Sequence, residues 1–351
     1  MAQNSNGKIQ VAVLGASGYS GAEALRLLLS HPDVRIQALT ADRKAGAPIG
    51  EVFPQLDGYG LPMLQRIEEL DWEQIDTVFC ALPHGTTQDV VAALPAKVKV
   101  VDLSADFRLR DIDAYATWYG HAHRAPSLQE EAVYGLTEFA RTAIANTRLV
   151  ACPGCYPTSA LLPLLPALEK KVIRTDDVII DSKSGVSGAG RALKEGSLYA
   201  EVAEGIHAYG IASHRHGPEI EQELSGAAGL PMTVTFTPHL MPMNRGILST
   251  IYVKLADGAD VEDLRAALAE RYADEPFVRL LPQGQAPQTR HVRGSNNASI
   301  GIFADRAPGR AMLICAIDNL VKGAAGQAVQ NFNVLHGLPE TTGLSLAPMF
   351  P

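Results

Sequence analysis

A glycine-rich turn near the start of the chain constrains the fold more than any other feature. Three glycines, at positions 15, 18 and 21, follow the apolar run Ile9–Leu14 and open the helical stretch Gly18–Ser30. A strand that enters a helix through such a turn is typical of a dinucleotide-binding βαβ unit, because glycine lets backbone N–H groups approach a pyrophosphate. A turn of this kind without a ligand is the alternative. The predicted cofactor loop consists of Gly15, Ser17, Gly18, Tyr19, Ser20 and Gly21.

The end of the second expected strand, Val34–Leu39, indicates which dinucleotide binds. Units that bind NAD place an acidic residue about 20 residues after the glycines, where it holds the ribose hydroxyls. This chain has Thr40 there, followed by Arg43 and Lys44. A hydroxyl and two cations suit a 2′-phosphate, so we predict NADP(H) as the cofactor. The alternative is that both cations are only solvated loop residues.

The distribution of strands and helices predicts two domains of different class. In the first 150 residues short β-branched runs alternate with helical stretches, which is typical of a parallel, doubly wound sheet. After about residue 175 strands follow one another with fewer helices, which favours a mixed sheet. The fold class is therefore α/β plus α+β. We expect a Rossmann-like NADP-binding domain at 1–151, to which the C-terminal helix and tail 318–351 return, and an α+β catalytic, substrate and self-association domain at 152–317.

Composition and charge disfavour nucleic-acid-binding, membrane-spanning and disulfide-rich proteins. The 351 residues carry a formal net charge of −8 without a block of like charge, which disfavours binding to nucleic acids or anionic membranes. No apolar run approaches the ~20 residues that span a bilayer, and the polar N-terminus lacks a signal sequence. The four cysteines are too few for a disulfide scaffold. We expect a cytoplasmic protein that uses a few local cations to bind an anionic small molecule.

Cys155 lies at or just before the start of a predicted helix, since Pro157 and an apolar run follow it. A helix N-terminus favours the thiolate, which makes this cysteine a candidate nucleophile. A small buried hydrophobic residue is the plainer interpretation. The C-x-x-C spacing with Cys152 also allows a redox disulfide, whereas a second such pair for structural zinc is absent from the sequence. We predict no metal site.

His214 and His216 precede a further predicted helix at Pro218–Leu224. On an extended segment residues i and i+2 point to the same side, so both imidazoles are candidates for acid–base work beside a cysteine. Two metal ligands, or a surface pair that caps the helix, are the alternatives.

Eight segments together carry a family resemblance. They are GASGYSG (15–21), ALPHG (81–85), DLSADFRL (102–109), PGCYPT (153–158), KSGVSGAGR (183–191), HRHGPE (214–219), PHLMPMNRGI (238–247) and DNLVKGAAGQAVQN (318–331). In these segments, which extend over nearly the whole length, the chain resembles the N-acetyl-γ-glutamyl-phosphate reductases of arginine biosynthesis. That family is similar in plan to the aspartate-semialdehyde dehydrogenases. PGCYPT followed by HRHGPE is specific to the reductase group.

The resemblance implies an oxidoreductase reaction and residues that perform it. The reaction is NADPH-dependent reductive dephosphorylation of N-acetyl-L-glutamyl 5-phosphate to N-acetyl-L-glutamate 5-semialdehyde, through a thioester on a cysteine. By the resemblance Cys155 is that nucleophile, His216 is the acid–base residue and His214 lies beside it. Cys152 is a departure, because the family often has asparagine at this position.

The substrate's phosphate and α-carboxylate require cations. The related dehydrogenases imply Arg108 for the phosphate, and a structural ion pair is the alternative for this residue. Further candidates for binding substrate are Lys183, Arg191 and Arg245.

Three residues outside the glycine loop are expected to contact the cofactor. Ser187 and Gly188 lie in a glycine–serine loop after a strand, and Asn319 lies at the start of the last helix. The strand-rich second half is a natural self-association surface, so we expect a homodimer or homotetramer.

Other functions stay open at this point. A related reductase of aspartyl phosphate, or of a carrier-bound aminoadipyl phosphate, needs the same cysteine and NADPH. A non-catalytic NADP(H)-binding sensor belongs to a different class, as does a thiol–disulfide protein that uses Cys152 and Cys155.

Overall fold

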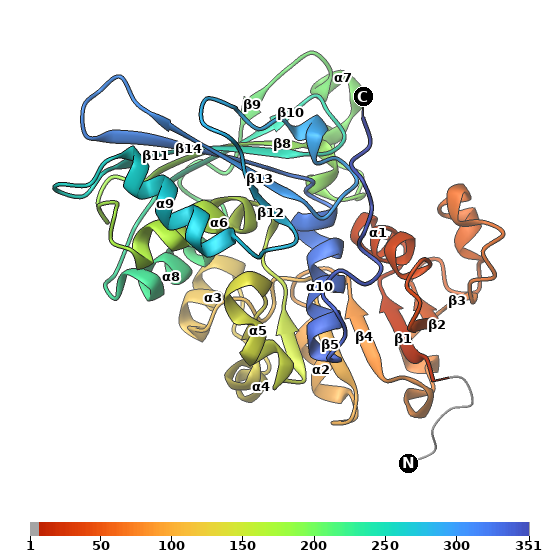
Figure 1. Ribbon diagram of the computed structural model, residues 1–351. Helices are drawn as coiled ribbons and strands as arrows, with labels where there is room; N and C mark the ends of the chain where they lie inside the picture. Colours follow the sequence, from red (N-terminus) through yellow and green to blue (C-terminus); the bar gives the residue numbers. More distant parts are fainter. Residues whose placement is uncertain (1–6, 351) are drawn as a thin grey trace. The chain divides into compact units, whose positions relative to one another are not determined.

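The computed structural model describes residues 7–350 and divides into two compact units (Figure 1). The first unit comprises residues 7–153 together with 324–345, and the second comprises 154–323 together with 346–350. The last helix thus belongs to the first unit. The residues from 346 onward group with the second unit, and not with the first as expected for the tail.

The first unit is built on a seven-stranded sheet in the order β3-β2-β1-β4-β5-β7-β6. All neighbouring strands are parallel. The order reverses between β1 and β4, the kind of switch point at which doubly wound sheets bind ligands. The strands are β1 (Ile9–Leu14), β2 (Val34–Thr40), β3 (Leu64–Gln65), β4 (Thr77–Cys80), β5 (Lys99–Asp102), β6 (Val133–Tyr134) and β7 (Leu149–Ala151).

Helices cover this sheet because its central strands are apolar on both faces. Every residue of β4 is buried, as is typical of a parallel strand between two helical layers. The helices are α1 (Tyr19–Leu28), α2 (Thr87–Ala93), α3 (Ile112–Tyr119), α4 (Pro126–Glu131), α5 (Thr137–Ala145) and α10 (Gly326–Leu335). The returning helix α10 packs against α1 and α5, with which it belongs to one unit.

The second unit contains a mixed seven-stranded sheet in the order β12-β13-β14-β11-β8-β10-β9. Its central pairs β13·β14, β14·β11 and β11·β8 are antiparallel, whereas β8·β10 and β12·β13 are parallel. The predicted class, a doubly wound parallel sheet followed by an α+β domain on a mixed sheet, is therefore confirmed. The strands are β8 (Ile179–Gly185), β9 (His207–Ala208), β10 (Thr235–Met241), β11 (Ile247–Lys254), β12 (Val278–Leu280), β13 (Ala298–Ala304) and β14 (Arg310–Ile317).

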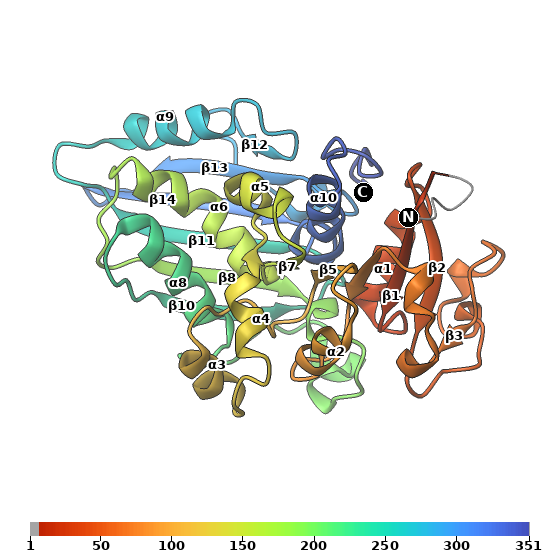
Figure 2. The ribbon, with the colours of Figure 1, turned by 90° about the horizontal axis from the view of Figure 1, so that it is seen from below.

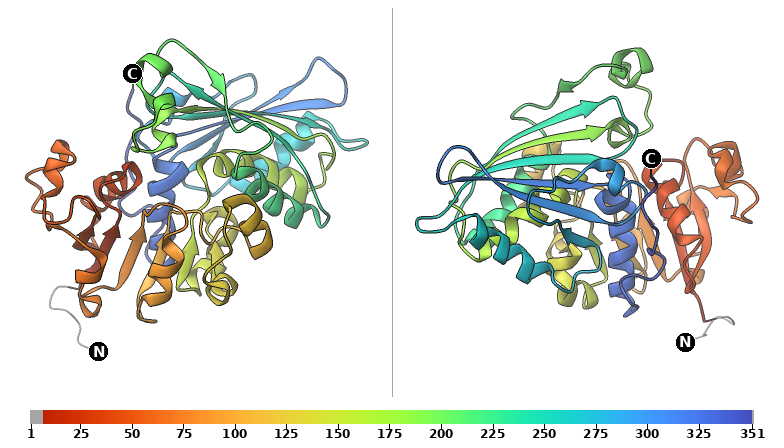
Figure 3. Two further views of the ribbon diagram at one scale, coloured as in Figure 1. Left: turned by 180° about the vertical axis from the view of Figure 1, so that it is seen from behind. Right: turned by 45° about the horizontal axis from the view of Figure 1, so that its top comes forward.

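Three helices of the second unit lie on one face of its sheet: α6 (Cys155–Glu169), α8 (His216–Ala228) and α9 (Val261–Tyr272) (Figures 2 and 3). A short helix, α7 (Tyr199–Val202), precedes β9. Alternate residues of β11 are buried and half-buried, because one face of the strand packs under α6 while the other does not. None of the helices in the range 7–350 has the length and hydrophobicity needed to cross a bilayer.

The segment 318–331, expected to be one helix, is divided. A π-helical turn occupies Val321–Ala325, and α10 begins only at Gly326. Single π-turns often occur at functional sites. The sequence patterns also missed the short strands β3, β6, β7, β9 and β12, whose two or three residues are too few to show a hydrophobic period.

A buried carboxyl group lies at the end of β5. The side chain of Asp102 is fully buried and accepts hydrogen bonds from the N–H and the hydroxyl of Ser104. The pKa of Asp102 is raised from 3.8 to about 7, mainly by burial; the nearby Asp106 also raises it, while the Ser104 bonds and Arg108 oppose the shift. The fold thus holds a proton on Asp102 that the unfolded chain releases.

We predict that Asp102 makes the protein less stable as the pH rises. Its pKa is higher in the folded state, so its contribution is most favourable below the unfolded pKa of 3.8 and is lost between there and about 7. Asp102→Asn removes this titration. Urea unfolding near pH 5 and near pH 8 should show a smaller loss of unfolding free energy in the variant than in the wild type.

The exposed carboxylate of Asp113 in α3 provides a matched control, since Asp113→Asn should keep the wild-type pH dependence. Equal pH dependence of Asp102→Asn and wild type would show that another group titrates.

Candidate functional site

The glycine loop of the first unit adopts the backbone that a dinucleotide phosphate requires. Gly15 has φ +80°, and a Cβ atom there would lie 2.4 Å from the carbonyl oxygen of Ala81. A Cβ at Gly21 would lie 2.5 Å from the carbonyl oxygen of Gly15. Gly18 forms the N-cap of α1 without a side chain, so the first N–H groups of the helix stay accessible to an anion. Ser17 lies in the turn before α1, Tyr19 and Ser20 are the first two residues of the helix, and all three are at least partly exposed.

Thr40 occupies the expected position at the end of β2, and its oxygens accept hydrogen bonds from the glycine loop. Its side chain is 1% exposed, and its hydroxyl oxygen accepts the N–H of Gly15 at 3.1 Å. The Thr40 carbonyl accepts the N–H of Ala16 at 2.9 Å. Arg43 and Lys44 are exposed beyond the strand.

In the second unit, Cys155 is the first residue of α6, at the start of the helix as the sequence predicted. Gly154 precedes it with extended backbone as the N-cap. The N–H of Gly154 donates to Oε1 of Glu219 at 2.7 Å, and Glu219 is 1% exposed. Because Glu219 lies in the first turn of α8, this bond joins the N-termini of both helices beside the cysteine.

Close packing surrounds Cys155 on the side of the π-helical turn. A Cβ atom at Gly323 would lie 2.7 Å from the Cβ and 3.2 Å from the Cα of Cys155. Real Cβ atoms essentially never come within 3.0 Å of such a neighbouring heavy atom. The turn can therefore pass this close to Cys155 only with glycine at position 323. Cys155 itself stays partly exposed, whereas Cys80, Cys152 and Cys315 are buried; all four are free thiols.

His216 is the first residue of α8, so it lies in a helix and not on the extended segment that the sequence suggested. The preceding residue, Arg215, already has helical φ and ψ of −61° and −15°. As a consequence, Nδ1 of His214 accepts the backbone N–H of His216 at 3.1 Å. The His216 ring lies 5.8 Å from the ring of Tyr156, the neighbour of Cys155.

His214 is enclosed by aromatic side chains. Its ring makes edge contacts with Tyr156, Tyr209 and Phe236 at centroid distances of 5.6, 5.5 and 5.5 Å. The hydroxyls of Tyr156 and Tyr209 share a hydrogen bond of 2.9 Å. Burial lowers the pKa of His214 to about 4, so this imidazole is neutral near pH 7. Its position therefore suits holding the backbone of His216 better than carrying a proton.

The glycine–serine loop after β8 is fixed by Asn319. Nδ2 of Asn319 donates to the Ser187 hydroxyl at 2.9 Å, and its Oδ1 accepts the N–H of Gly246 at 2.8 Å. A Cβ at Gly188 would lie 3.1 Å from Oγ of Ser184. Asn319, expected to contact the cofactor, thus uses its amide to hold the loop that carries Ser187 and Gly188.

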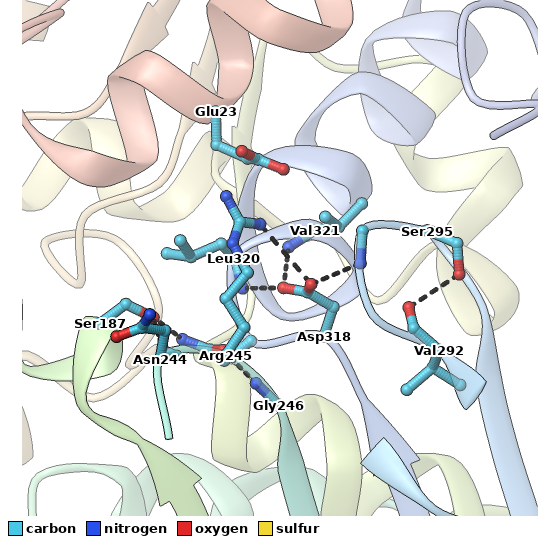
Figure 4. A network of polar contacts seen from close by, with 12 residues as sticks. Glu23, Ser187, Asn244, Arg245, Gly246, Val292, Ser295, Asp318, Leu320 and Val321 are labelled. Atoms are coloured by element: carbon cyan, nitrogen blue, oxygen red, sulfur yellow. Dashed lines mark hydrogen bonds and ion pairs between the residues drawn. The ribbon is translucent and has the colours of Figure 1, made fainter. Parts of the chain in front are cut away.

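Arg245 forms an ion pair with Asp318, with 3.5 Å between Nη1 and Oδ2 (Figure 4). The Asp318 carboxylate is fully buried, and its Oδ1 also accepts the N–H groups of Leu320 and Val321. Arg245 therefore balances a buried charge at the start of the last helical segment. Arg191, by contrast, is exposed in the loop after β8.

Arg108 is buried in the first unit. Its Nε donates to the carbonyl of Cys152 at 2.7 Å, and Nη2 donates to the carbonyl of Leu103 at 3.0 Å. The thiol of Cys152 accepts the side-chain amide of Asn331 in α10 at 3.6 Å. This geometry supports a structural role for Arg108, in bonds to carbonyl groups, more than the predicted role in binding phosphate.

Lys183 lies on the face of the sheet that points away from α6. Its Nζ pairs with Asp181, 3.1 Å from Oδ2. The alternate residue Ser182 faces the other way, where Ser249 bonds both to it and to Ser159 of α6 at 2.7 and 2.6 Å. The structure therefore does not bring Lys183 together with Cys155.

Sequence reasoning missed Glu219 and Gly323 as supports of Cys155. Both lie inside segments that carried the resemblance, HRHGPE and the small-residue run after 318. The available signals were a carboxylate in the first turn of a helix and a glycine inside a helical pattern, which usually marks a close approach.

Two family models match the chain. Residues 10–147 match the semialdehyde dehydrogenase, NAD binding domain, and residues 155–319 match the semialdehyde dehydrogenase, dimerisation domain. Together they extend over most of both units.

Curated relatives are similar over nearly the full length. The N-acetyl-γ-glutamyl-phosphate reductase of Rhodospirillum rubrum is 62% identical over 349 residues, which is 98% of this chain and 99% of the relative. A chloroplastic relative of the same name from Oryza sativa subsp. japonica is 58% identical and covers 98% of this chain and 83% of its own length.

Solved structures share the fold at low identity. Aspartate semialdehyde dehydrogenase II of Vibrio cholerae, complexed with ASA, has a TM-score of 0.73 at 19% identity, and the match covers 94% of this chain and 98% of that one. The Candida albicans aspartate semialdehyde dehydrogenase with NADP has a TM-score of 0.69 at 20% identity, with the same coverage. From the family models and the curated relatives, the chain belongs to the semialdehyde dehydrogenase family and, within it, to the N-acetyl-γ-glutamyl-phosphate reductases.

Proposed function

We propose that this chain reduces N-acetyl-L-glutamyl 5-phosphate to N-acetyl-L-glutamate 5-semialdehyde with NADPH, releasing inorganic phosphate, as a step of L-arginine biosynthesis. The observation that carries the proposal is the placement of Cys155 at the N-terminus of α6, tied to α8 through Glu219 and with His216 at the start of α8. The full-length identity to reductases of this name supports the choice of substrate.

The first unit fits the proposed cofactor. The N-terminus of α1 and the glycine loop suit a pyrophosphate, and exposed Arg43 and Lys44 suit a 2′-phosphate. When bound, NADPH supplies the hydride for the reduction. Thr40 maintains the loop through its bond to the N–H of Gly15.

The chain's own residues then have distinct roles. His216 takes the proton of the Cys155 thiol, and the thiolate attacks the acyl carbon of the substrate. The bond from that carbon to the phosphate oxygen breaks with its electron pair, leaving a thioester on Cys155. After reduction, the carbon–sulfur bond breaks, the semialdehyde leaves, and His216 returns the proton to the sulfur. His214 is a positioning residue that holds the start of α8.

The proposal includes self-association through the sheet of the second unit and a cytosolic location. The family model matching 155–319 is described as a dimerisation domain. Alternate side chains of β11, among them Thr250 and Tyr252, are half-buried on the face that does not pack under α6. We infer a homodimer or homotetramer built on this face.

Aspartyl phosphate and carrier-bound aminoadipyl phosphate are the competing substrates, since the same thiol chemistry serves all three. Assays of the reverse reaction, with each semialdehyde, phosphate and NADP⁺, separate them. Reduction of NADP⁺ fastest with N-acetylglutamate semialdehyde supports the proposal. No turnover with any of the three, despite cofactor binding, would favour a sensor.

We predict that Cys155→Ser loses nearly all reductase activity yet still binds NADPH. A serine hydroxyl is far less ionised than a thiol near neutral pH, and an oxygen ester accepts hydride less readily than a thioester. Iodoacetamide should label Cys155 faster than the three buried cysteines, and excess acyl phosphate should protect it. Retention of more than about a tenth of the rate, a loss of only ~1.4 kcal/mol, would rule out covalent catalysis at this residue.

The two histidines should respond differently to substitution. His216→Asn removes the proton carrier, so the rate should fall and the pH profile of kcat/KM should lose the corresponding limb. His214→Asn keeps an oxygen that can accept the N–H of His216, so it should retain the wild-type pH profile with a smaller loss of rate. The assignment is reversed if the limb disappears only in the His214 variant.

Arg43 should determine the preference for NADPH over NADH. Loss of one charge-assisted contact to a phosphate costs about 1–3 kcal/mol, so Arg43→Ala should weaken NADPH by roughly 5- to 150-fold and NADH hardly at all. Arg35→Ala, at an exposed arginine of β2, is the control and should change neither. Equal effects on both cofactors would place the 2′-phosphate elsewhere.

A further inference from the structure

Asp106 is a fully buried carboxylate to which the proposed catalytic cycle gives no role. It lies in the segment after β5, yet its carboxylate binds the loop that follows β4. Oδ1 accepts the N–H of Gly85 at 2.7 Å, and Oδ2 accepts the N–H of Thr87 at 2.9 Å. The Tyr115 hydroxyl donates to Oδ1 at 3.1 Å. Two backbone N–H groups and one hydroxyl thus donate to the two oxygens of this side chain.

The loop held in this way is exposed. Pro83, His84 and Thr86 are exposed, whereas the carboxylate that fixes the neighbouring N–H groups is in the interior. A third hydrogen bond joins the same two segments, since Nδ1 of His84 in the loop accepts the N–H of Ala105, the neighbour of Asp106, at 3.0 Å. The conformation of a surface turn is therefore set by a buried segment from the next βα connection.

Glycine at position 85 is part of the same arrangement. Gly85 has φ +83°, and a Cβ atom there would lie 2.9 Å from Nε2 of His121. The ring of His121 makes an edge contact with Tyr115, which in turn donates to Asp106. A side chain at position 85 therefore strains the loop and displaces His121.

The loop lies at the point in the sheet where doubly wound sheets bind ligands. β1 and β4 are the strands between which the order reverses, and the loop leaves the carboxyl end of β4. The glycine loop leaves the carboxyl end of β1 and touches it, because Gly15 packs against the carbonyl of Ala81. A dinucleotide bound across this switch point contacts both loops.

We propose that Asp106 is a positioning residue for NADPH: its carboxylate holds the Pro83–Thr87 loop in the conformation that receives the half of the dinucleotide beyond the pyrophosphate. This inference rests on the proposed cofactor and names the residue that shapes its site. The adenosine half lies at Thr40–Lys44 on the other side of β1 and does not depend on Asp106.

The test compares direct binding of two probes, NADPH and 2′,5′-ADP, by fluorescence or calorimetry. In Asp106→Asn an amide N–H₂ faces one of the two backbone N–H groups, so the loop loses an acceptor. The Kd of NADPH should rise roughly ten-fold or more, while the Kd of 2′,5′-ADP changes by less than about two-fold. Tyr115→Phe, which keeps both backbone bonds, is the matched control and should bind NADPH within about three-fold of wild type.

Gly85→Ala provides a second route if Asp106→Asn does not fold, and it should show the same split between the probes. Unchanged NADPH affinity in a folded Asp106→Asn, or an equal loss of both probes, would overturn the inference. Because turnover is not needed, a wild-type protein that binds neither probe would instead disprove the proposed cofactor.

Discussion

Two helices of the second unit begin at the same point, and a buried carboxylate holds them there. Glu219 in the first turn of α8 accepts the N–H of Gly154, the N-cap of α6. A thiolate on Cys155 lies at the N-terminus of α6, where the helix dipole stabilises negative charge. The same bond places His216, the first residue of α8, near the residue that follows the cysteine. The residues proposed as nucleophile and proton carrier are thus positioned by one backbone contact.

Close backbone approach is the second constraint, and glycine meets it in both units. At Gly15 a side chain would collide with the end of β4, and at Gly323 it would collide with Cys155. Buried polar side chains then fix the loops that glycine leaves flexible: Thr40 holds the glycine loop and Asn319 holds the loop of Ser187. The functional loops of this chain therefore owe their shape to interior residues more than to their own sequence.

The sequence predicted those features whose cause is local. The glycine spacing and the helix start at Cys155 depend on neighbouring residues, and both were located correctly to within a position. Arg108 could not be assigned, because its acceptors include the carbonyl of Cys152, which only the folded sheet brings near. Lys183 could have been assigned better, since Asp181 two residues earlier shares its strand face. The sequence predicted an extended segment at His214 and His216 and a helix only from Pro218. Helix α8 in fact begins at His216, before the apolar residues that indicate it.

The central claim is that Cys155 carries the acyl group. Mixing the protein with N-acetylglutamyl phosphate in the absence of NADPH, followed by mass spectrometry of acid-quenched protein and its peptides, tests it most directly. We expect a mass increase of one N-acetylglutamyl group on the peptide that contains Cys155, stoichiometric release of phosphate, and loss of the adduct when NADPH is added. Phosphate release without an adduct, or an adduct confined to another peptide, would contradict it.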